Sequence, residues 1–328
     1  MNNTYGTYGT NENNGTLIYM NSRELTTMED FKEKLLPLLE SPGFRVDCHD
    51  VYKNNGITKT GLTIVDEAGN GNKSTVSPCI YLEGYLREYR NGASLEKIAE
   101  DIVKLYEESK LEVRNSMDFR FLRDFNKVKD MLCFQIINAE KNSRSLKETP
   151  HILMYDFAVV FRVYVEFVEG SIRVKNHFME MWGKTAEELF DVALSNTSKL
   201  FPADIISKRD LFLKEMGLFM SPEENEEVLQ SMGPDMFVCS NAGRCNGAGV
   251  IFYEGLLQSF GKEHGSFFVL PSSIHECIFL VDNGEMDKEY LLNMVNDNNA
   301  TQVAEDEVLS NNIYYYDAEN DFLDIIYL

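Results

Sequence analysis

Basic residues are scarce in this chain of 328 residues, which has 31 lysines and arginines against 53 aspartates and glutamates and a formal net charge of −22. Nucleic-acid phosphates are bound by clustered lysine and arginine side chains, so this balance argues against a general affinity for DNA or RNA. The charge favours solubility, and it would suit a basic partner or a mimic of nucleic acid. We expect no direct nucleic-acid binding, and an ordinary acidic cytoplasmic protein is the plainest interpretation.

Paired cysteines and long apolar runs are missing too. No C-x-x-C pair occurs, and most cysteines stand among apolar neighbours, as Cys133 does between Leu132 and Phe134. This pattern is typical of reduced, buried thiols and not of a disulfide framework. No apolar run approaches the length of a membrane span, and no basic region followed by an apolar run opens the chain. We therefore predict a cytoplasmic protein without a membrane partner. The six cysteines are Cys48, Cys79, Cys133, Cys239, Cys245 and Cys277.

Apolar residues are present in the amount expected of a globular protein, with 44% hydrophobic and 12% aromatic residues. The length allows two domains or one large domain with a substantial core. Residues 1–24 are the exception, because they are rich in Asn, Thr, Gly and Tyr and cannot bury much surface. We predict a flexible tail there.

Two strand-like runs followed by an amphipathic helix recur three times along the chain. Each helix opens on a capping residue, namely Ser94, Thr185 or Asp287. This order predicts an α+β fold of mainly antiparallel sheets with helices packed on them. The three hairpin–helix units would be 25–112, 113–215 and 216–328, although hairpin–helix is a common arrangement and its recurrence by chance is the alternative. The runs are 44–52 and 61–66, 157–167 and 171–175, and 267–270 and 277–281.

Further helices and a last hairpin complete the expected architecture. Thr27 is a capping residue that predicts the first helix, and residues 249–260 predict another. The acidic run 221–227 is interpreted either as the start of a short helix or as a linker. Residues 313–316 and 322–327 predict the final hairpin. The helix residues that we expect to be buried are Leu95, Ile98, Ile102, Leu189, Val192, Leu291 and Met294. Val103, Leu105 and Tyr106 are expected on the same apolar helix face as Leu95, Ile98 and Ile102.

The first candidate site is the polar interruption between two strand-like runs at residues 271–276. There Ser273, His275 and Glu276 supply a hydroxyl, an imidazole and a carboxylate, so that His275 would be a base or ligand and Glu276 its acidic partner. Neighbouring residues of a strand point to opposite faces, so these two share a site only where the backbone bulges. A turn whose hydroxyls bond the local backbone explains the same residues.

The second candidate site is the glycine-rich loop 241–249. It follows a short strand and precedes a helix, which is the context in which free backbone amides bind an anion. Arg244 would add positive charge to such a site, and Asn246 and Gly247 lie in the same loop. The loop matches neither the P-loop nor the dinucleotide-binding pattern. Glycines that allow the chain to turn and pack closely are the competing explanation.

A metal site would draw on Cys239, Cys245, His264 and either His275 or Cys277. The spacing of the first two cysteines fits no familiar zinc motif, and the other residues are isolated in the sequence. We therefore predict no metal, and no motif specifies a cofactor.

Four landmarks resemble a known family. They are Thr149-Pro150-His151 before an aliphatic strand, Met181 to Leu189, Leu270 to Glu276, and Tyr314 to Asp317. From about Met28 onward the chain resembles an uncharacterised domain-of-unknown-function family of clostridial bacteria, whose members are often associated with mobile elements or gut commensals. More loosely, it is similar to another uncharacterised family of Firmicutes proteins, in which a histidine also falls between two strands. Neither resemblance implies an activity or a catalytic residue.

Hypotheses of three classes follow from these observations. The first is a protein-binding or regulatory accessory factor of a mobile element or its host, because no coherent catalytic constellation stands out. The alternative is a hydrolase or nucleotide-processing enzyme with a pocket near His275 and the Asn246–Gly247 loop, and the third is nucleic-acid mimicry. An enzyme predicts one concave site that contains both loops, whereas a binding module predicts an exposed apolar patch with a polar rim. The oligomeric state is left open.

Overall fold

The computed structural model describes Arg23 and residues 25–40, 44–66, 78–112, 119–166, 170–216, 219–271 and 273–326. The described chain divides into two compact units, of which the first contains residues up to 52 and 58–118 and the second contains 53–57 and 119–328. The tail expected at 1–24 lies outside the described residues apart from Arg23. The expected division into units 25–112, 113–215 and 216–328 stays a prediction. The predicted α+β class with antiparallel sheets is confirmed.

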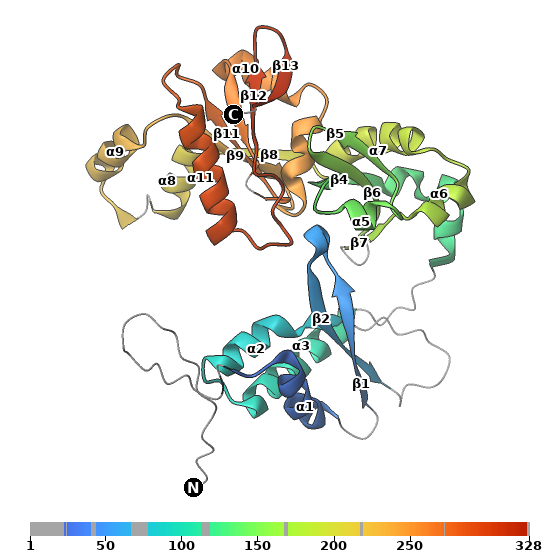
Figure 1. Ribbon diagram of the computed structural model, residues 1–328. Coiled ribbons are helices and arrows are strands. Elements are labelled where there is room, and N and C mark those ends of the chain that lie inside the picture. Colours follow the sequence, from blue (N-terminus) through green and yellow to red (C-terminus); the bar gives the residue numbers. More distant parts are fainter. Residues whose placement is uncertain are drawn as a thin grey trace, which may run out of the picture. The chain divides into compact units, whose positions relative to one another are not determined.

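The first unit packs helices against a small antiparallel sheet (blue and cyan in Figure 1). Its elements are α1 Met28–Leu39, β1 Phe44–Tyr52, β2 Thr58–Asp66, β3 Cys79–Tyr81, α2 Leu82–Arg90 and α3 Leu95–Glu112. As the sequence predicts, α1 begins after Thr27, whose hydroxyl accepts the N–H of Asp30 while the Asp30 carboxylate accepts the N–H of Thr27. Phe31, Leu62 and Ile102 are fully buried in the core of this unit.

The buried face of α3 is narrower than we expected. Ile98, Ile102 and Tyr106 are buried, in agreement with the prediction. Val103 and Leu105 are each 41% exposed, so the prediction was wrong for these two residues. The buried positions are spaced four residues apart and form one stripe, and the two exposed residues lie to the side of it.

The second unit begins with a four-stranded antiparallel sheet (green in Figure 1), which α7 contacts along β4. The strands are β4 Leu132–Asn138, β5 His151–Met154, β6 Phe157–Val165 and β7 Gly170–Arg173. The helical segments of this part are η1 Asn54–Gly56, η2 Phe119–Arg123, α4 Phe125–Val128, η3 Lys129–Met131, α5 Ser143–Leu146, α6 Asn176–Trp182 and α7 Ala186–Leu200. The predicted hairpin is present as β6 and β7, and α7 begins with the predicted capping box of Thr185 and Glu188. The local sequence is therefore enough to predict this hairpin and the start of this helix.

A six-stranded antiparallel sheet forms the rest of the second unit, in the order β13-β12-β10-β11-β9-β8. Its elements are β8 Ala203–Ser207, α8 Lys208–Glu215, α9 Pro222–Ser231, β9 Met236–Asn241, η6 Gly247–Phe252, α10 Leu256–His264, β10 Phe267–Leu270, β11 Cys277–Val281, α11 Lys288–Thr301, β12 Ile313–Asp317 and β13 Phe322–Ile326. The predicted strand pair is β10 with β11, and the predicted last hairpin is β12 with β13. The acidic run belongs to α9, which Ser221 caps.

The prediction of a single helix over 249–260 was wrong. The structure has the short 3₁₀ segment η6 and then α10, with a break at Tyr253 to Gly255. Gly255 has a φ of 72°, in the left-handed region that a continuous helix excludes. The two segments are therefore separate, and η6 packs against β4 where Gly249 lies next to the Phe134 ring.

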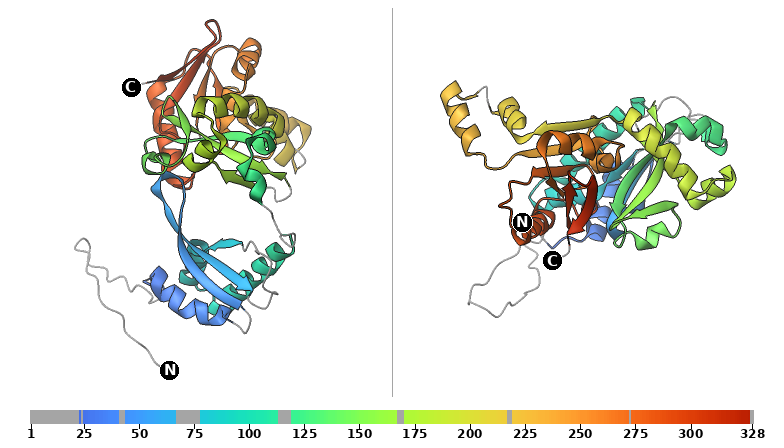
Figure 2. Two further views of the ribbon diagram at one scale, coloured as in Figure 1. Left: turned by 90° about the vertical axis from the view of Figure 1, so that its right-hand side faces the viewer. Right: turned by 90° about the horizontal axis from the view of Figure 1, so that it is seen from above.

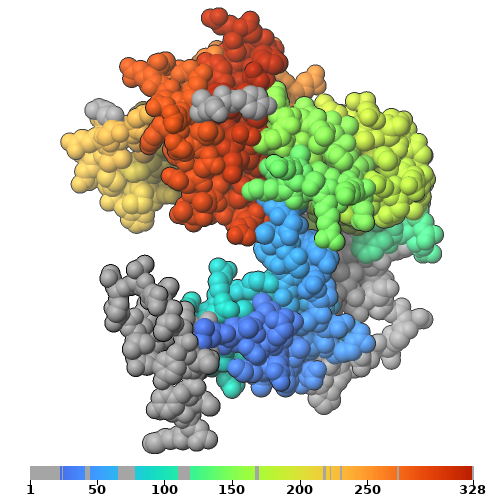
Figure 3. All heavy atoms as spheres, in the orientation of Figure 1, coloured from blue at the N-terminus to red at the C-terminus, as the bar shows by residue number. Residues whose placement is uncertain are grey.

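One large core joins the two sheets of the second unit, and Figure 2 shows the green and the orange-red strands side by side. It contains Phe134 and Phe161 of the first sheet together with Phe267 and Phe279 of the second. In the space-filling view of Figure 3 the atoms of these two regions adjoin on the face shown. On α11, Leu291 is buried as expected, but Met294 is 39% exposed, which corrects that prediction. No described helix is long and apolar enough to cross a membrane.

The α3 stripe gives a paired test of the first unit's core. We expect Ile102→Ala to destabilise the protein by roughly 2–5 kcal/mol, because it removes a fully buried branched side chain and leaves a cavity. The neighbouring Val103→Ala is the matched control and should change the free energy of unfolding by less than about 0.5 kcal/mol. Urea unfolding of the full chain, followed by far-ultraviolet circular dichroism, measures both. Equal effects of the two substitutions would contradict the observed packing of α3.

Candidate active site

The strand pair β9 and β11 brings the two candidate loops of the sequence together. The strands are antiparallel, with Cys239 opposite Cys277, so the residues after β9 meet the residues before β11. The Ser240 hydroxyl donates to the His275 carbonyl over 2.7 Å. The Asn246 N–H donates to Nδ1 of His275 over 3.1 Å. Loop 241–249 and loop 271–276 therefore form one site.

Cys245 lies at the tip of a tight turn that follows β9. Asn241, which is buried, holds this turn, because its side-chain oxygen accepts the Cys245 N–H over 3.3 Å and its Nδ2 donates to the Cys245 carbonyl over 2.9 Å. The residues on either side, Arg244 and Asn246, have φ values of 49° and 53°. The left-handed region is unfavourable for a residue such as arginine, and such conformations cluster at functional sites. The turn therefore presents Cys245 on a constrained backbone.

Gly247 allows the cysteine turn to pack against the histidine loop. A Cβ atom at this position would lie 2.6 Å from the Asn241 backbone nitrogen and 2.7 Å from the His275 carbonyl oxygen, and it would also collide with the Ser240 hydroxyl. Only glycine leaves room for this contact. The competing explanation of the loop, that its glycines permit close packing, thus applies at Gly247, and the packing itself builds the site.

Cys245, His275 and Glu307 form a chain of polar interactions. The hydrogen bond to His275 is the main reason why the pKa of the Cys245 thiol is lowered. The same bond is the main reason why the pKa of His275 is raised, and the negative charge of Glu307 raises it further. Nε2 of His275 lies 3.4 Å from Oε1 of Glu307. Because the Asn246 N–H occupies Nδ1, the neutral ring carries its proton on Nε2, facing the Glu307 carboxylate.

Four of the remaining five cysteines have a raised thiol pKa instead of a lowered one. Burial raises the pKa of Cys133 to about 12, and it also raises the pKa of Cys48, Cys239 and Cys277. Thiols buried among apolar groups are inert, whereas an exposed thiol with a lowered pKa beside an imidazole is the reactive kind. Cys245 is exposed and has that environment.

The histidine loop is fixed by its own backbone. The Ser273 hydroxyl accepts the His275 N–H over 3.0 Å, and the Ile274 N–H donates to the Glu307 carbonyl over 2.9 Å. The predicted residues Ser273 and His275 thus lie in one turn, with the serine supporting the histidine. The carboxylate that faces the His275 ring comes from Glu307, and the neighbouring Glu276 contributes its backbone carbonyl, which accepts the Ser273 N–H over 3.2 Å.

A cavity of about 290 Å³ opens beside Cys245. Cys245 and Asn246 line it from the turn, and Arg162 and Ser171 line it from strands β6 and β7. Within the turn, Nδ2 of Asn246 lies 3.3 Å from Sγ of Cys245 and donates to it. The cavity therefore places a guanidinium, an amide and a thiol around one small space.

The other predicted ligand residue of the turn, Arg244, is engaged elsewhere. Its guanidinium pairs with the carboxylate of Asp204 on β8 over 3.0 Å. The arginine that lines the cavity is Arg162. Among the described residues there is no cluster of three or more His, Cys, Asp or Glu side chains that would hold a metal ion.

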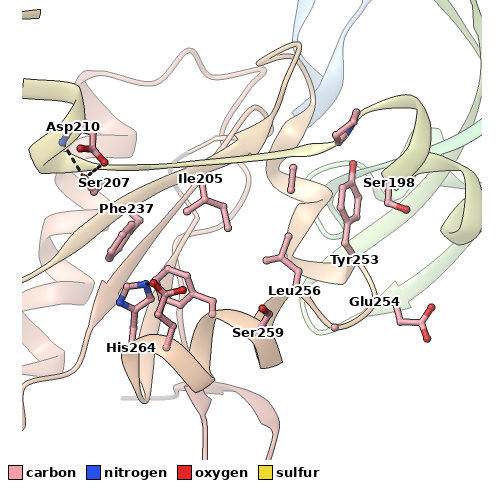
Figure 4. A pocket seen from close by; sticks show the side chains of 15 residues that line it. Ser198, Ile205, Ser207, Asp210, Phe237, Tyr253, Glu254, Leu256, Ser259 and His264 are labelled. Atoms are coloured by element: carbon pink, nitrogen blue, oxygen red, sulfur yellow. Dashed lines mark hydrogen bonds and ion pairs between the residues drawn. The ribbon is translucent and has the colours of Figure 1, made fainter. Parts of the chain in front are cut away.

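A larger cavity of about 650 Å³ lies between β8 and α10 (Figure 4). Its imidazole, His264, contacts the rings of Phe237 and Phe260, and its nearest acidic atom is Oε1 of Glu263 at 3.8 Å. Asp210, which also lines it, is engaged by the Ser207 hydroxyl at the start of α8. The lining contains no thiol. Of these two cavities, the smaller one is lined by the thiol whose pKa is lowered.

Sequence reasoning missed three residues of this site. Cys245 was considered only as a metal ligand, and its position in a glycine-flanked turn directly after a strand is the signal that would have shown it as a nucleophile. Glu307 and Arg162 carry no such local signal, because each reaches the site from a distant part of the chain.

The chain belongs to a protein family of unknown function, DUF5688, whose model matches residues 26–318. The predicted membership in a family of unknown function is thus confirmed. The clostridial and mobile-element origin stays a prediction. No curated protein and no solved structure matches the chain.

The lowered pKa of Cys245 predicts unusual alkylation kinetics. At pH 6.5 an ordinary thiol, with a pKa of about 8.5, is about 1% thiolate, and a lowered pKa raises that fraction. We expect Cys245 in the native protein to react with iodoacetamide several-fold faster at this pH than in His275→Ala, and the two rates should converge above about pH 9, where both thiols are ionised. Peptide-resolved mass spectrometry after timed quenching measures the rates. Identical rates at pH 6.5 would show that His275 does not activate the thiol.

Proposed function

We propose that this DUF5688 protein is a cysteine-dependent hydrolase that acts through a covalent acyl-thioester. The observation that carries the proposal is the interaction of Cys245 with His275 and of His275 with Glu307, next to a cavity that Cys245 lines. A nucleophile in contact with a base, and a base oriented by a third group, is the arrangement that activates a thiol.

The proposed first step is attack of Cys245 Sγ on an acyl carbon. At Nδ1 of His275 the thiol proton replaces the Asn246 N–H, a sulfur–carbon bond forms, and the imidazolium delivers that proton to the departing group. Glu307 stabilises the imidazolium through its contact with Nε2. Water then attacks the thioester with His275 as base, which releases the acid and restores the thiol.

The Asn246 residue supplies donors for the charge that develops on the acyl oxygen. Its Nδ2 already lies beside the sulfur. Its backbone N–H is bound to Nδ1 of His275 at rest, and protonation of Nδ1 releases it. The backbone N–H of the residue after the nucleophile is a recurrent oxyanion donor in hydrolases. We assign this role to Asn246.

This proposal develops the hydrolase alternative of the sequence analysis, because the two loops contact each other and the cysteine loop lines a cavity. Nucleotide processing is less well supported, since the loop lacks the lysine and glycine pattern that cradles a polyphosphate. The protein-binding or regulatory accessory role, the cytoplasmic location and the partner stay predictions that no observation in the described residues tests.

The test uses p-nitrophenyl acetate as an acyl donor. The native protein should release nitrophenol in a burst stoichiometric with protein, and acid quenching should trap one acetyl group on Cys245, detected by peptide mass spectrometry. Cys245→Ser should abolish the burst. His275→Ala should slow acylation by about 10²-fold or more, the contribution typical of a general base. Glu307→Gln should slow it less, because it removes the orienting charge and leaves the base.

Cys79→Ser is the matched control, because Cys79 is the other exposed cysteine and belongs to the first unit. This variant should keep the full burst. Far-ultraviolet circular dichroism of all variants establishes that they are folded. Acetyl groups distributed over several cysteines, or a burst that survives Cys245→Ser, would refute the proposed nucleophile.

A further inference from the structure

Two arginines lie side by side on the sheet that borders the Cys245 cavity. Arg162 of β6 and Arg173 of β7 are directly opposite each other in the antiparallel register. Side chains at opposed positions project from the same face of a sheet, so the two positive charges are neighbours. Both residues are partly buried.

In the described part of the chain, the hydrogen-bond partners of both guanidinium groups are neutral. Arg162 donates to the Ser171 hydroxyl over 2.6 Å, to the Ser171 carbonyl over 3.1 Å and to Oε1 of Gln135 over 2.9 Å. Arg173 donates to Oδ1 of Asn54 over 2.9 Å. The ion pairs among the described residues include neither arginine, although the chain has a net charge of −22.

The surroundings lower the pKa of both side chains. Burial lowers the pKa of Arg162, and burial together with the charge of Arg162 lowers the pKa of Arg173 to about 10. Like charges held close together are unfavourable, and a nearby negative charge offsets this cost. The thiolate of Cys245 supplies one such charge when it forms, and an anionic ligand would supply another. An anion in this position would relieve both effects.

The hydrogen bonds also orient Arg162 toward a ligand. A guanidinium has five N–H donors, of which Gln135 and Ser171 take three, so two remain within the described residues. A guanidinium that is fixed in this way binds the two oxygens of a carboxylate or phosphate in a defined plane. Arg162 lines the same 290 Å³ cavity as Cys245 and Asn246.

We infer that the substrate of the Cys245 site carries an anionic group, a carboxylate or a phosphate, which Arg162 binds while the acyl carbon lies at the sulfur. Arg173 adds the second positive charge from the neighbouring strand. This inference rests on the proposed hydrolase function for the reacting centre, and the anion subsite itself can be tested without it.

The first experiment compares two alkylating agents of similar size at Cys245. Iodoacetate carries a carboxylate and iodoacetamide does not, so the ratio of their rates reports an anion subsite next to the thiol. Arg162→Gln should lower this ratio by about tenfold or more, which corresponds to the loss of a charged hydrogen bond. The charge of Arg162 also helps to lower the pKa of Cys245, so both alkylation rates fall with the thiolate fraction in this variant, and the ratio cancels that common effect. Arg162→Lys keeps the charge but loses the planar pair of donors, so its ratio should be intermediate.

Arg244→Gln is the matched control, because it removes the same charge from the residue next to Cys245 while the Asp204 pair holds that side chain outside the cavity. It should leave the ratio unchanged. An equal fall in Arg162→Gln and Arg244→Gln would show only a general charge effect and would overturn the inference, as would no fall in either variant.

A second measurement separates this inference from the proposed reaction. In Cys245→Ser, which has no nucleophilic thiol, we expect phosphate or succinate to raise the unfolding temperature, and we expect Cys245→Ser/Arg162→Gln to lose that increase. The anion that acts at the lower concentration identifies the group as phosphate or carboxylate. A shift in the first variant but not in the second supports the subsite even where the thiol proves inert. No shift with either anion would overturn it.

Discussion

The antiparallel pairing of β9 with β11 is the constraint on which the rest of the site depends. Its register sets Cys239 opposite Cys277, and a slip by one residue would move every following side chain to the other face. Beyond the ends of the strands, the same register brings the Asn246 N–H to Nδ1 of His275. Since β10 pairs with both β11 and β12, the segment before β12 is led to this end of the sheet as well. Glu307 therefore completes the chain of interactions.

The charge of the whole chain and the charge of the cavity have opposite signs, and the two are compatible. The excess of acidic residues acts over the surface, where it favours solubility and opposes binding of nucleic-acid backbones. Arg162 lines the cavity and Arg173 lies opposite it on the neighbouring strand, and both are partly buried, so less solvent screens their charges. The inferred anionic substrate is compatible with this contrast, because the cavity offers a positive charge while the acidic surface disfavours extended polyanions.

The competing explanations of the two candidate loops are not exclusive in the folded protein. The Ser273 hydroxyl bonds the local backbone as a simple turn would predict, and this bond fixes the residue that carries the imidazole. Gly247 permits close packing, and the packing brings the cysteine turn against His275. Turn chemistry and site chemistry share the same residues here, because a reactive group must be held by a backbone that cannot relax.

What the sequence determined by itself is the set of local structures. Capping residues such as Thr27 and Thr185 start their helices, and alternating apolar runs form the hairpins, because these depend on neighbours within a few residues. The sequence also located both loops of the site. Only the tertiary structure decided that Glu307, and not the adjacent Glu276, faces His275, and that Arg162, and not Arg244, lines the cavity. Those choices depend on strand order and register, which join segments far apart in the chain and leave no local pattern to read.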